Sequence, residues 1–190
     1  MTTRTTISLD DLLKLPAEEM LRYDETPTIE DLRTRQQVYF DDIAVGMELP
    51  KYIKRYSTID LLRWCVTMEN THRIHYDLPF AVNHDKVPGV LFQGSWRGSI
   101  LTAWLKNWTL PNGWPWKERW QVREMVVANE VTIVWGRVTG TQVRDGMGMV
   151  ELELGIKNQD GTEGCPGSAT VAMPVRGGRE IPYPFVPPKD

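Results

Sequence analysis

Hydrophobic residues recur with helical spacing at the start of the chain. In residues 8–23, leucine and methionine side chains are spaced among acidic ones, which predicts an amphipathic helix that is interrupted or restarted at Pro16. A second, shorter helix is predicted at Thr28–Gln36, because an acidic residue follows the capping threonine by three places. Residues 1–37 are therefore expected to form an N-terminal helical arm.

The main domain is expected to span residues 38–176 and to open with a strand. A turn-rich approach leads to this strand, predicted at Leu49–Tyr56. Ser57 or Thr58 then caps a helix at Ile59–Glu69, whose apolar residues lie mostly on one stripe.

Two further helices are predicted before the pattern changes. A short one is expected at Pro79–Asp85, followed by a loop at Lys86–Gln93. A long apolar helix is expected at Ser95–Trp108, opening directly after Gly94.

After a stretch rich in proline, glycine and tryptophan at Thr109–Lys117, β-branched and apolar residues predict consecutive strands separated by turn signals. These strands are Arg119–Glu130, Val131–Arg144, Met147–Lys157 and Ser168–Val175. The fold class is therefore α+β, with an antiparallel sheet that needs a helix against one face. The proline-rich tail, residues 177–190, is expected to be extended surface chain.

Composition narrows the class of protein. The 190 residues are 41% hydrophobic, which excludes disorder throughout, and 22 Lys+Arg against 25 Asp+Glu leave no basic surplus for nucleic acid or an anionic membrane. No apolar run is long enough to span a bilayer, and the first residues lack the apolar region of a secretory signal. Only 2 cysteines are present, so we expect no disulfide framework and a cytoplasmic location.

Tryptophan is frequent, with 8 copies, and several lie in and just after the long helix. They include Trp96, Trp104, Trp108, Trp114, Trp116 and Trp120. We expect at least half of them to be core, while the others could line a pocket for a bulky or cyclic ligand.

The candidate chemistry lies between Asn70 and Ser95. All 3 histidines of the chain fall in this segment, at His72, His75 and His84. Imidazole is the side chain that titrates nearest neutral pH, so this segment concentrates the proton carriers of the protein.

This segment resembles the MaoC-like hydratase/dehydratase family. The resemblance rests on NTHRIHYD at 70–77, Pro79-Phe80-Ala81, Pro88-Gly89-Val90 and the glycine before the long helix, and it extends from about Tyr39 to about Val175. It implies the hot-dog fold, in which an antiparallel sheet wraps around a long central helix.

The resemblance also indicates a sub-group. The (R)-specific enoyl-CoA hydratases of the family carry D-x-N-P-x-H-x-D, and Asn70 stands here in place of their first aspartate. The sequence is more similar to N-x-H-R-I-H-Y-D, a pattern of mesaconyl-CoA-type hydratases and mitochondrial 3-hydroxyacyl-thioester dehydratases. That sub-group commonly has His-Gly before the central helix, where this chain has Gln93-Gly94.

The resemblance implies a hydratase or dehydratase that adds or removes water at the 2,3-position of an acyl-CoA or acyl-carrier thioester. We expect His75 to carry the proton, Asn70 to orient the water, and backbone amides at Gly94 to bind the thioester oxygen. The expected substrate-binding residues are His72, Arg73, Tyr76, Gln93 and Ser95. No cofactor is expected beyond the CoA of the substrate, and no metal. The implied assembly is a homodimer or a hot-dog heteromer, with no nucleic-acid or membrane partner.

Simpler roles remain open for several of these residues. His72 could be a structural hydrogen-bonding residue, and Arg73 could pair with Asp77 instead of binding CoA phosphates. Tyr76 could be core packing, and Asp77 a local cap. His84, in a polar loop, is expected to be solvated. A metal held by His72 and His75 lacks an apparent third ligand.

Two other functions remain open as well. The chain could be a hot-dog thioesterase, although such enzymes generally use a carboxylate that Asn70 does not supply. It could also be a non-catalytic partner subunit of a heteromeric hydratase, with Asn70 and Gln93 as departures of a lost site.

Overall fold

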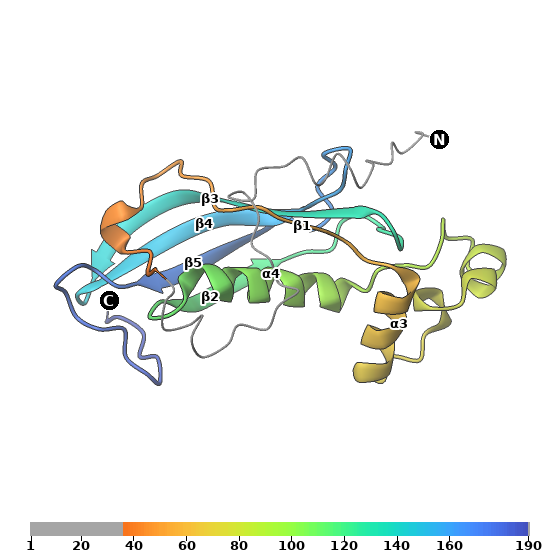
Figure 1. The fold of residues 1–190 in the computed structure, drawn as a ribbon, viewed down its shortest axis with the longest axis horizontal. Coiled ribbons are helices and arrows are strands. Elements are labelled where there is room, and N and C mark those ends of the chain that lie inside the picture. Colours follow the sequence, from red (N-terminus) through yellow and green to blue (C-terminus); the bar gives the residue numbers. More distant parts are fainter. Residues whose placement is uncertain (1–35, 190) are drawn as a thin grey trace.

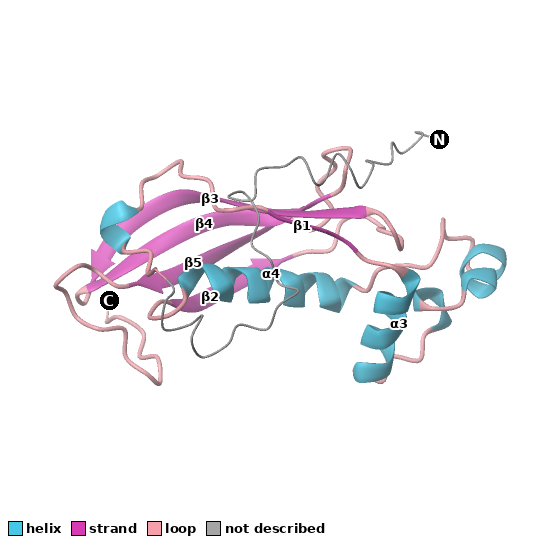
Figure 2. Ribbon diagram, in the orientation of Figure 1, coloured by secondary structure: helices cyan, strands magenta, loops and turns pink. Residues whose placement is uncertain are grey.

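A five-stranded antiparallel sheet curves along the long helix α4, Gly94–Thr109 (Figures 1 and 2). The computed structural model describes residues 36–189. The helix predicted at 8–23, and residues 28–35 of the second predicted helix, lie outside the described residues. The predicted α+β class and hot-dog arrangement are confirmed for the main domain.

The order of the strands across the sheet is β1-β3-β4-β5-β2. The strands are β1 Tyr52–Arg55, β2 Trp114–Trp120, β3 Val131–Arg144, β4 Met147–Lys157 and β5 Gly167–Met173. β3 and β4 have the predicted bounds, and the turn at Asp145-Gly146 joins them with both residues at positive φ. The two edges of the sheet are therefore β1 and β2.

Helix α3, Thr58–Thr67, begins at a complete capping box. Ser57 Oγ accepts the backbone N–H of Asp60, and the Asp60 carboxylate accepts the backbone N–H of Ser57 at 2.8 Å. Three short helical turns complete the described elements: η2 Phe40–Asp42, η3 Arg73–His75 and η4 Phe80–His84. The predicted helices at 59–69, 79–85 and 95–108 are thus confirmed within one or two residues at each end.

The strand predicted at Arg119–Glu130 is wrong. The strand occupies Trp114–Trp120 instead, and most of the predicted segment is a loop. Pro115 argues against a central strand, but β2 is an edge strand, where a proline at a bulge costs no ladder hydrogen bond. Arg97 holds the following loop, because its Nη1 donates to the carbonyls of Glu124 and Gly164 at 2.9 and 3.3 Å.

The core lies between α4 and the concave face of the sheet. The buried side of the helix presents large apolar side chains to β3, β4 and β5, and Trp104 is fully buried among them. Its indole Nε1 donates to the carbonyl of Pro50 at 2.9 Å. Gly136 on β3 makes room for this ring, because a Cβ there would lie 2.6 Å from Cη2 of Trp104.

The C-terminal tail contains neither helix nor strand between residues 177 and 189, yet it packs on the molecule. Ile181 and Phe185 lie against a second apolar cluster of buried residues on β4 and β5, formed by Met147, Met149 and Ala172. The tail therefore covers part of the sheet surface rather than only extending over it.

Replacing Gly136 by alanine is expected to lower the free energy of unfolding by about 1–3 kcal/mol, because the new methyl group overpacks the Trp104 contact. Gly140→Ala, on the same strand, is the matched control. Its Cβ would meet Glu151 side-chain atoms at 3.5 Å, an ordinary contact, so the expected change is within about 0.5 kcal/mol. Urea unfolding of both variants measures the difference, and equal stabilities would contradict this account of the core.

Candidate active site

Three segments meet where α4 begins: the end of α3, residues 70–77, and the approach at residues 91–94. The backbone N–H of Asn70 donates to the carbonyl of Cys65 at 2.9 Å. The N–H of Leu91 donates to the carbonyl of Ile74, also at 2.9 Å. The histidine segment is therefore fixed both to α3 and to the chain that leads into α4.

His75 is half-buried, and its ring is bound to the approach segment. Its Nδ1 lies 2.9 Å from the carbonyl oxygen of Leu91. Because a carbonyl only accepts hydrogen bonds, Nδ1 must carry the proton, which leaves Nε2 of the neutral ring with a free lone pair. Burial lowers the pKa of His75; the bond to Leu91 opposes this effect, and the charge of His72 adds to it. The ring is thus a neutral base at physiological pH.

The N-terminus of α4 offers backbone donors close in sequence to Leu91. The N–H groups of Gly94, Ser95 and Trp96 have no acceptor within the helix, and no side chain of the N-cap residue Gln93 caps them. No acidic residue lies in the first turn, so the helix dipole is not neutralised there. A Cβ at Gly94 would lie 2.8 Å from Cγ2 of Val122, so the absence of a side chain at this glycine lets Val122 pack closely against the start of the helix.

Asn70 and His72 both take part in local turns. Asn70 Oδ1 accepts the backbone N–H of His72 at 3.0 Å, and His72 Nδ1 accepts that of Ile74 at 3.4 Å. The ring of His72 is exposed, with its centroid 6.0 Å from that of His75. These contacts support the role of His72 as a structural hydrogen-bonding residue, which the sequence left open.

Arg73 forms the ion pair with Asp77 that the sequence left as an alternative to CoA binding. Its Nε and Nη2 donate to Asp77 Oδ2 at 2.9 and 2.6 Å. Asp77 Oδ1 accepts the backbone N–H of Phe80 at 3.0 Å, which confirms Asp77 as a local cap. This backbone bond and the bond from Arg73 lower the pKa of Asp77. The ion pair of Arg73 and Asp77 therefore stabilises the start of η4.

Tyr76 and His84 point to other partners. The Tyr76 hydroxyl donates to the carbonyl of Thr71 at 2.9 Å. His84 is exposed, as expected, with Nδ1 2.6 Å from Asp85 Oδ1 and its ring stacked on Phe80. Neither contact connects these residues to the start of α4.

Gln93 is buried, with 3% of its surface exposed, while Ser95 is exposed. Gln93 Nε2 donates to Sγ of Cys65 at 3.1 Å, and that thiol lies 3.9 Å from the carbonyl oxygen of His75. Sequence reasoning did not single out Cys65, which reads as one more apolar position on the stripe of α3. Burial raises the pKa of this thiol, so it remains protonated.

Aromatic side chains pack beside the first turn of α4. Trp96 stacks on Trp64 of α3 with ring centroids 5.2 Å apart, and it contacts Tyr56 and Phe92 edge-on at 4.8 and 4.9 Å. Trp104 and Trp108 are core residues further along the helix. Trp96 and Trp64 thus belong to an aromatic cluster at the first turn of α4, whereas Trp114 and Trp116 pack against Phe185 of the C-terminal tail.

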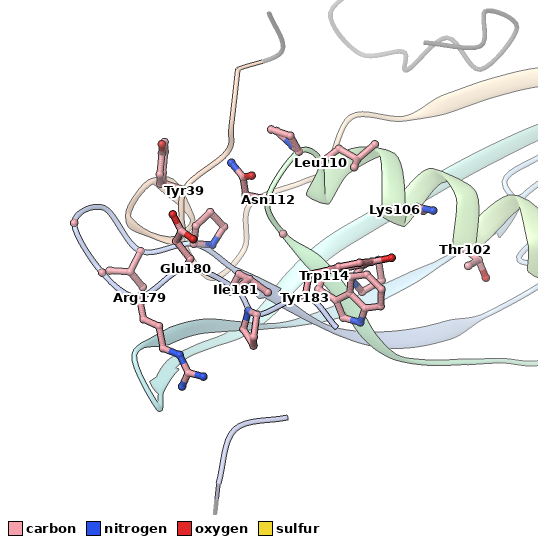
Figure 3. Close-up of a pocket in the computed structure, with 18 residues that line it drawn as sticks. Tyr39, Thr102, Lys106, Leu110, Asn112, Trp114, Arg179, Glu180, Ile181 and Tyr183 are labelled. Carbon is pink, nitrogen blue, oxygen red and sulfur yellow. The ribbon is translucent and has the colours of Figure 1, made fainter. Parts of the chain in front are cut away.

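A cavity of about 880 Å³ lies at the opposite end of α4 (Figure 3). Thr102 and Lys106 of the helix line it, together with Trp114 and Tyr183, whose ring centroids are 6.1 Å apart. None of the predicted site residues lines it. Within residues 36–189, no group of three or more histidine, cysteine or acidic side chains could hold a metal ion, and no helix is long and apolar enough to cross a membrane.

Comparisons with known proteins agree with this fold. The family model of hydroxyacyl-thioester dehydratase type 2 matches residues 30–113, which include the histidine segment and the start of α4. No curated protein matches the chain.

Several solved structures share the fold at low sequence identity. The R-hydratase PhaJ1 from Pseudomonas aeruginosa is 15% identical with a TM-score of 0.65, covering 81% of this chain and 96% of its own. A MaoC-like dehydratase from Rhodospirillum rubrum is 17% identical with a TM-score of 0.63, covering 73% and 98%. The ChsH1-ChsH2 complex from Mycobacterium tuberculosis has a chain 15% identical with a TM-score of 0.59, covering 68% and 98%. Residues 30–113 thus resemble the hydroxyacyl-thioester dehydratase type 2 family, and the described residues share the fold of these hydratase and dehydratase structures.

Proposed function

We propose that this protein is a hydratase/dehydratase that adds or removes water at the 2,3-position of an acyl-CoA or acyl-carrier thioester. The observation that carries the proposal is the bond between His75 Nδ1 and the Leu91 carbonyl, which fixes a neutral base to the segment that leads into the uncapped start of α4. The matched family of hydroxyacyl-thioester dehydratases supports the same reaction.

In the hydration direction, His75 Nε2 takes a proton from water as the water oxygen bonds to C3 of the enoyl thioester. Negative charge then develops on the thioester oxygen, where the N–H groups of Gly94 and Ser95 stabilise it. The imidazolium of His75 returns the proton to C2, so the elements of water are added and the base is regenerated. Asn70, whose oxygen is held by His72, would donate to the water from Nδ2. Dehydration follows the same steps in reverse and needs no cofactor beyond the CoA of the substrate.

We propose a second hot-dog chain as partner, either a copy of this one or a related chain. The ChsH1-ChsH2 complex is one such assembly among the similar structures. The sheet also ends in two edge strands, β1 and β2, and edge strands favour pairing with another chain. The proposed cytoplasmic location is supported by Cys65 and Cys165, which are both free thiols.

The full chain is expected to hydrate enoyl thioesters, measured as loss of their ultraviolet absorbance, and His75→Ala is expected to lower kcat/KM about 10²- to 10⁴-fold through loss of the base. His84→Ala is the matched control, because that ring is exposed and interacts with Asp85 and Phe80, so its rate should equal wild type. Release of free thiol in place of hydration would indicate a thioesterase instead. A His75→Ala variant with wild-type rate would remove His75 from the mechanism.

The acid limb of the pH profile is expected to lie below the ordinary histidine pKa of 6.5, because burial lowers the pKa of His75. The ring therefore stays neutral to lower pH than a solvated imidazole, and kcat/KM should fall about tenfold per pH unit only below its folded pKa. Initial rates between roughly pH 4.5 and pH 8 locate this acid limb, with the rate at neutral pH as the reference. An acid limb centred above the ordinary value would contradict the assignment of a half-buried base.

Gly94→Ala is expected to lower kcat on the order of 100-fold, because a methyl group there blocks access to the amide donors. The same methyl group would also clash with Val122, so the double variant Gly94→Ala/Val122→Ala separates the two effects. If access is the reason, the double variant regains stability in thermal unfolding but not kcat. Recovery of kcat in the double variant would show that the glycine serves only to accommodate Val122.

A further inference from the structure

A chain of hydrogen bonds links the base to the N-cap of α4. The buried thiol of Cys65 stays protonated, and its S–H is directed at the carbonyl oxygen of His75, 3.9 Å away. With its proton used there, Sγ can only accept from Gln93, and the group within 3.1 Å is the amide Nε2. Cys65 therefore connects Gln93 to the backbone of His75.

This chain fixes which way the Gln93 amide faces. If the amide were reversed, its oxygen would meet a sulfur that has no proton left to donate. With Nε2 on the sulfur, Oε1 faces away from Cys65, and it is buried without a hydrogen-bond partner among the described residues. A buried amide oxygen is costly unless it accepts a hydrogen bond, so the site is built to receive a donor.

The other end of this hydrogen-bond chain is His75, which is bound to the same short segment of backbone as Gln93. The ring of His75 is bound to Leu91, two residues before Gln93, and the carbonyl of His75 contacts the same thiol as the Gln93 amide. Nε2 of His75 and Oε1 of Gln93 are then both acceptors, and the reacting water has two protons to donate. A water held by both has its lone pair free to attack C3, and Asn70 Nδ2 can still donate to the water oxygen.

We propose that Gln93 is a further catalytic residue, whose Oε1 accepts a hydrogen bond from the reacting water while His75 Nε2 takes that water's other proton. This inference rests on the proposed function. It assigns Gln93 to the reacting water instead of to substrate binding. The (R)-specific hydratases of the family have a carboxylate five places before the histidine, where this protein has Asn70, and Gln93 would supply an acceptor for the water in its place.

The test compares Gln93→Leu and Gln93→Glu with wild type in the hydration assay on the full chain. Leucine is similar in size to glutamine but has no hydrogen-bond acceptor, so the reacting water would be misplaced. The kcat should therefore fall about 100-fold, while KM stays within about twofold of wild type. Glutamate keeps an oxygen acceptor at the same place, so kcat should stay within about tenfold of wild type above its carboxyl pKa. Its pH profile should gain a second acid limb, which a purely structural role would not produce.

Other outcomes overturn the inference without touching the proposed function. A raised KM with unchanged kcat in Gln93→Leu would make Gln93 a substrate-binding residue. A folded Gln93→Leu variant with wild-type kcat and KM would leave the side chain with no part in the reaction. If Gln93→Leu does not fold, a Gln93→Glu variant without a second acid limb still decides against the proposal. Absence of hydration by wild type would instead count against the proposed function itself.

Discussion

The packing of α4 against the curved sheet fixes the position of the N-terminal end of this helix, and the proposed mechanism depends on that end. Trp104 is fully buried over Gly136, and its indole is tied to the carbonyl of Pro50, so the helix cannot slide along the sheet. Arg97, in the first turn, binds the carbonyls of Glu124 and Gly164 and holds the loop after β2 over the same end. The start of α4 is therefore rigidly placed, with its amides free of any side-chain cap.

The histidine segment is built onto that end by backbone contacts. Ile74 and Leu91 join through a main-chain bond, and the ring of His75 adds a second bond to the same residue. Arg73 and Asp77 form the adjoining cap of η4. Most polar residues of the segment thus build its turns, whereas the ring of His75 is bound through Nδ1 to the chain that leads into α4 and keeps Nε2 unprotonated.

Periodicity was sufficient to predict β3, β4, α3 and α4, because each carries a regular apolar stripe and clear turn or cap residues. It misplaced β2, since an edge strand tolerates the proline and tryptophan composition that resembles a loop. At the site, the cluster of histidines and the glycine before α4 were visible in the sequence. The pairing of Gln93 with Cys65 was not, because no spacing rule connects two residues on different elements, and only the folded chain brings α3 to the N-cap of α4.

The state of one ring tests the central claim most directly. Long-range ¹H–¹⁵N NMR spectra of the imidazoles, with His75→Ala used to assign the signal, report which ring nitrogen carries the proton. The account predicts that at neutral pH His75 is uncharged, protonated at Nδ1 toward Leu91 and unprotonated at Nε2. A proton on Nε2, or an imidazolium at that pH, would contradict it.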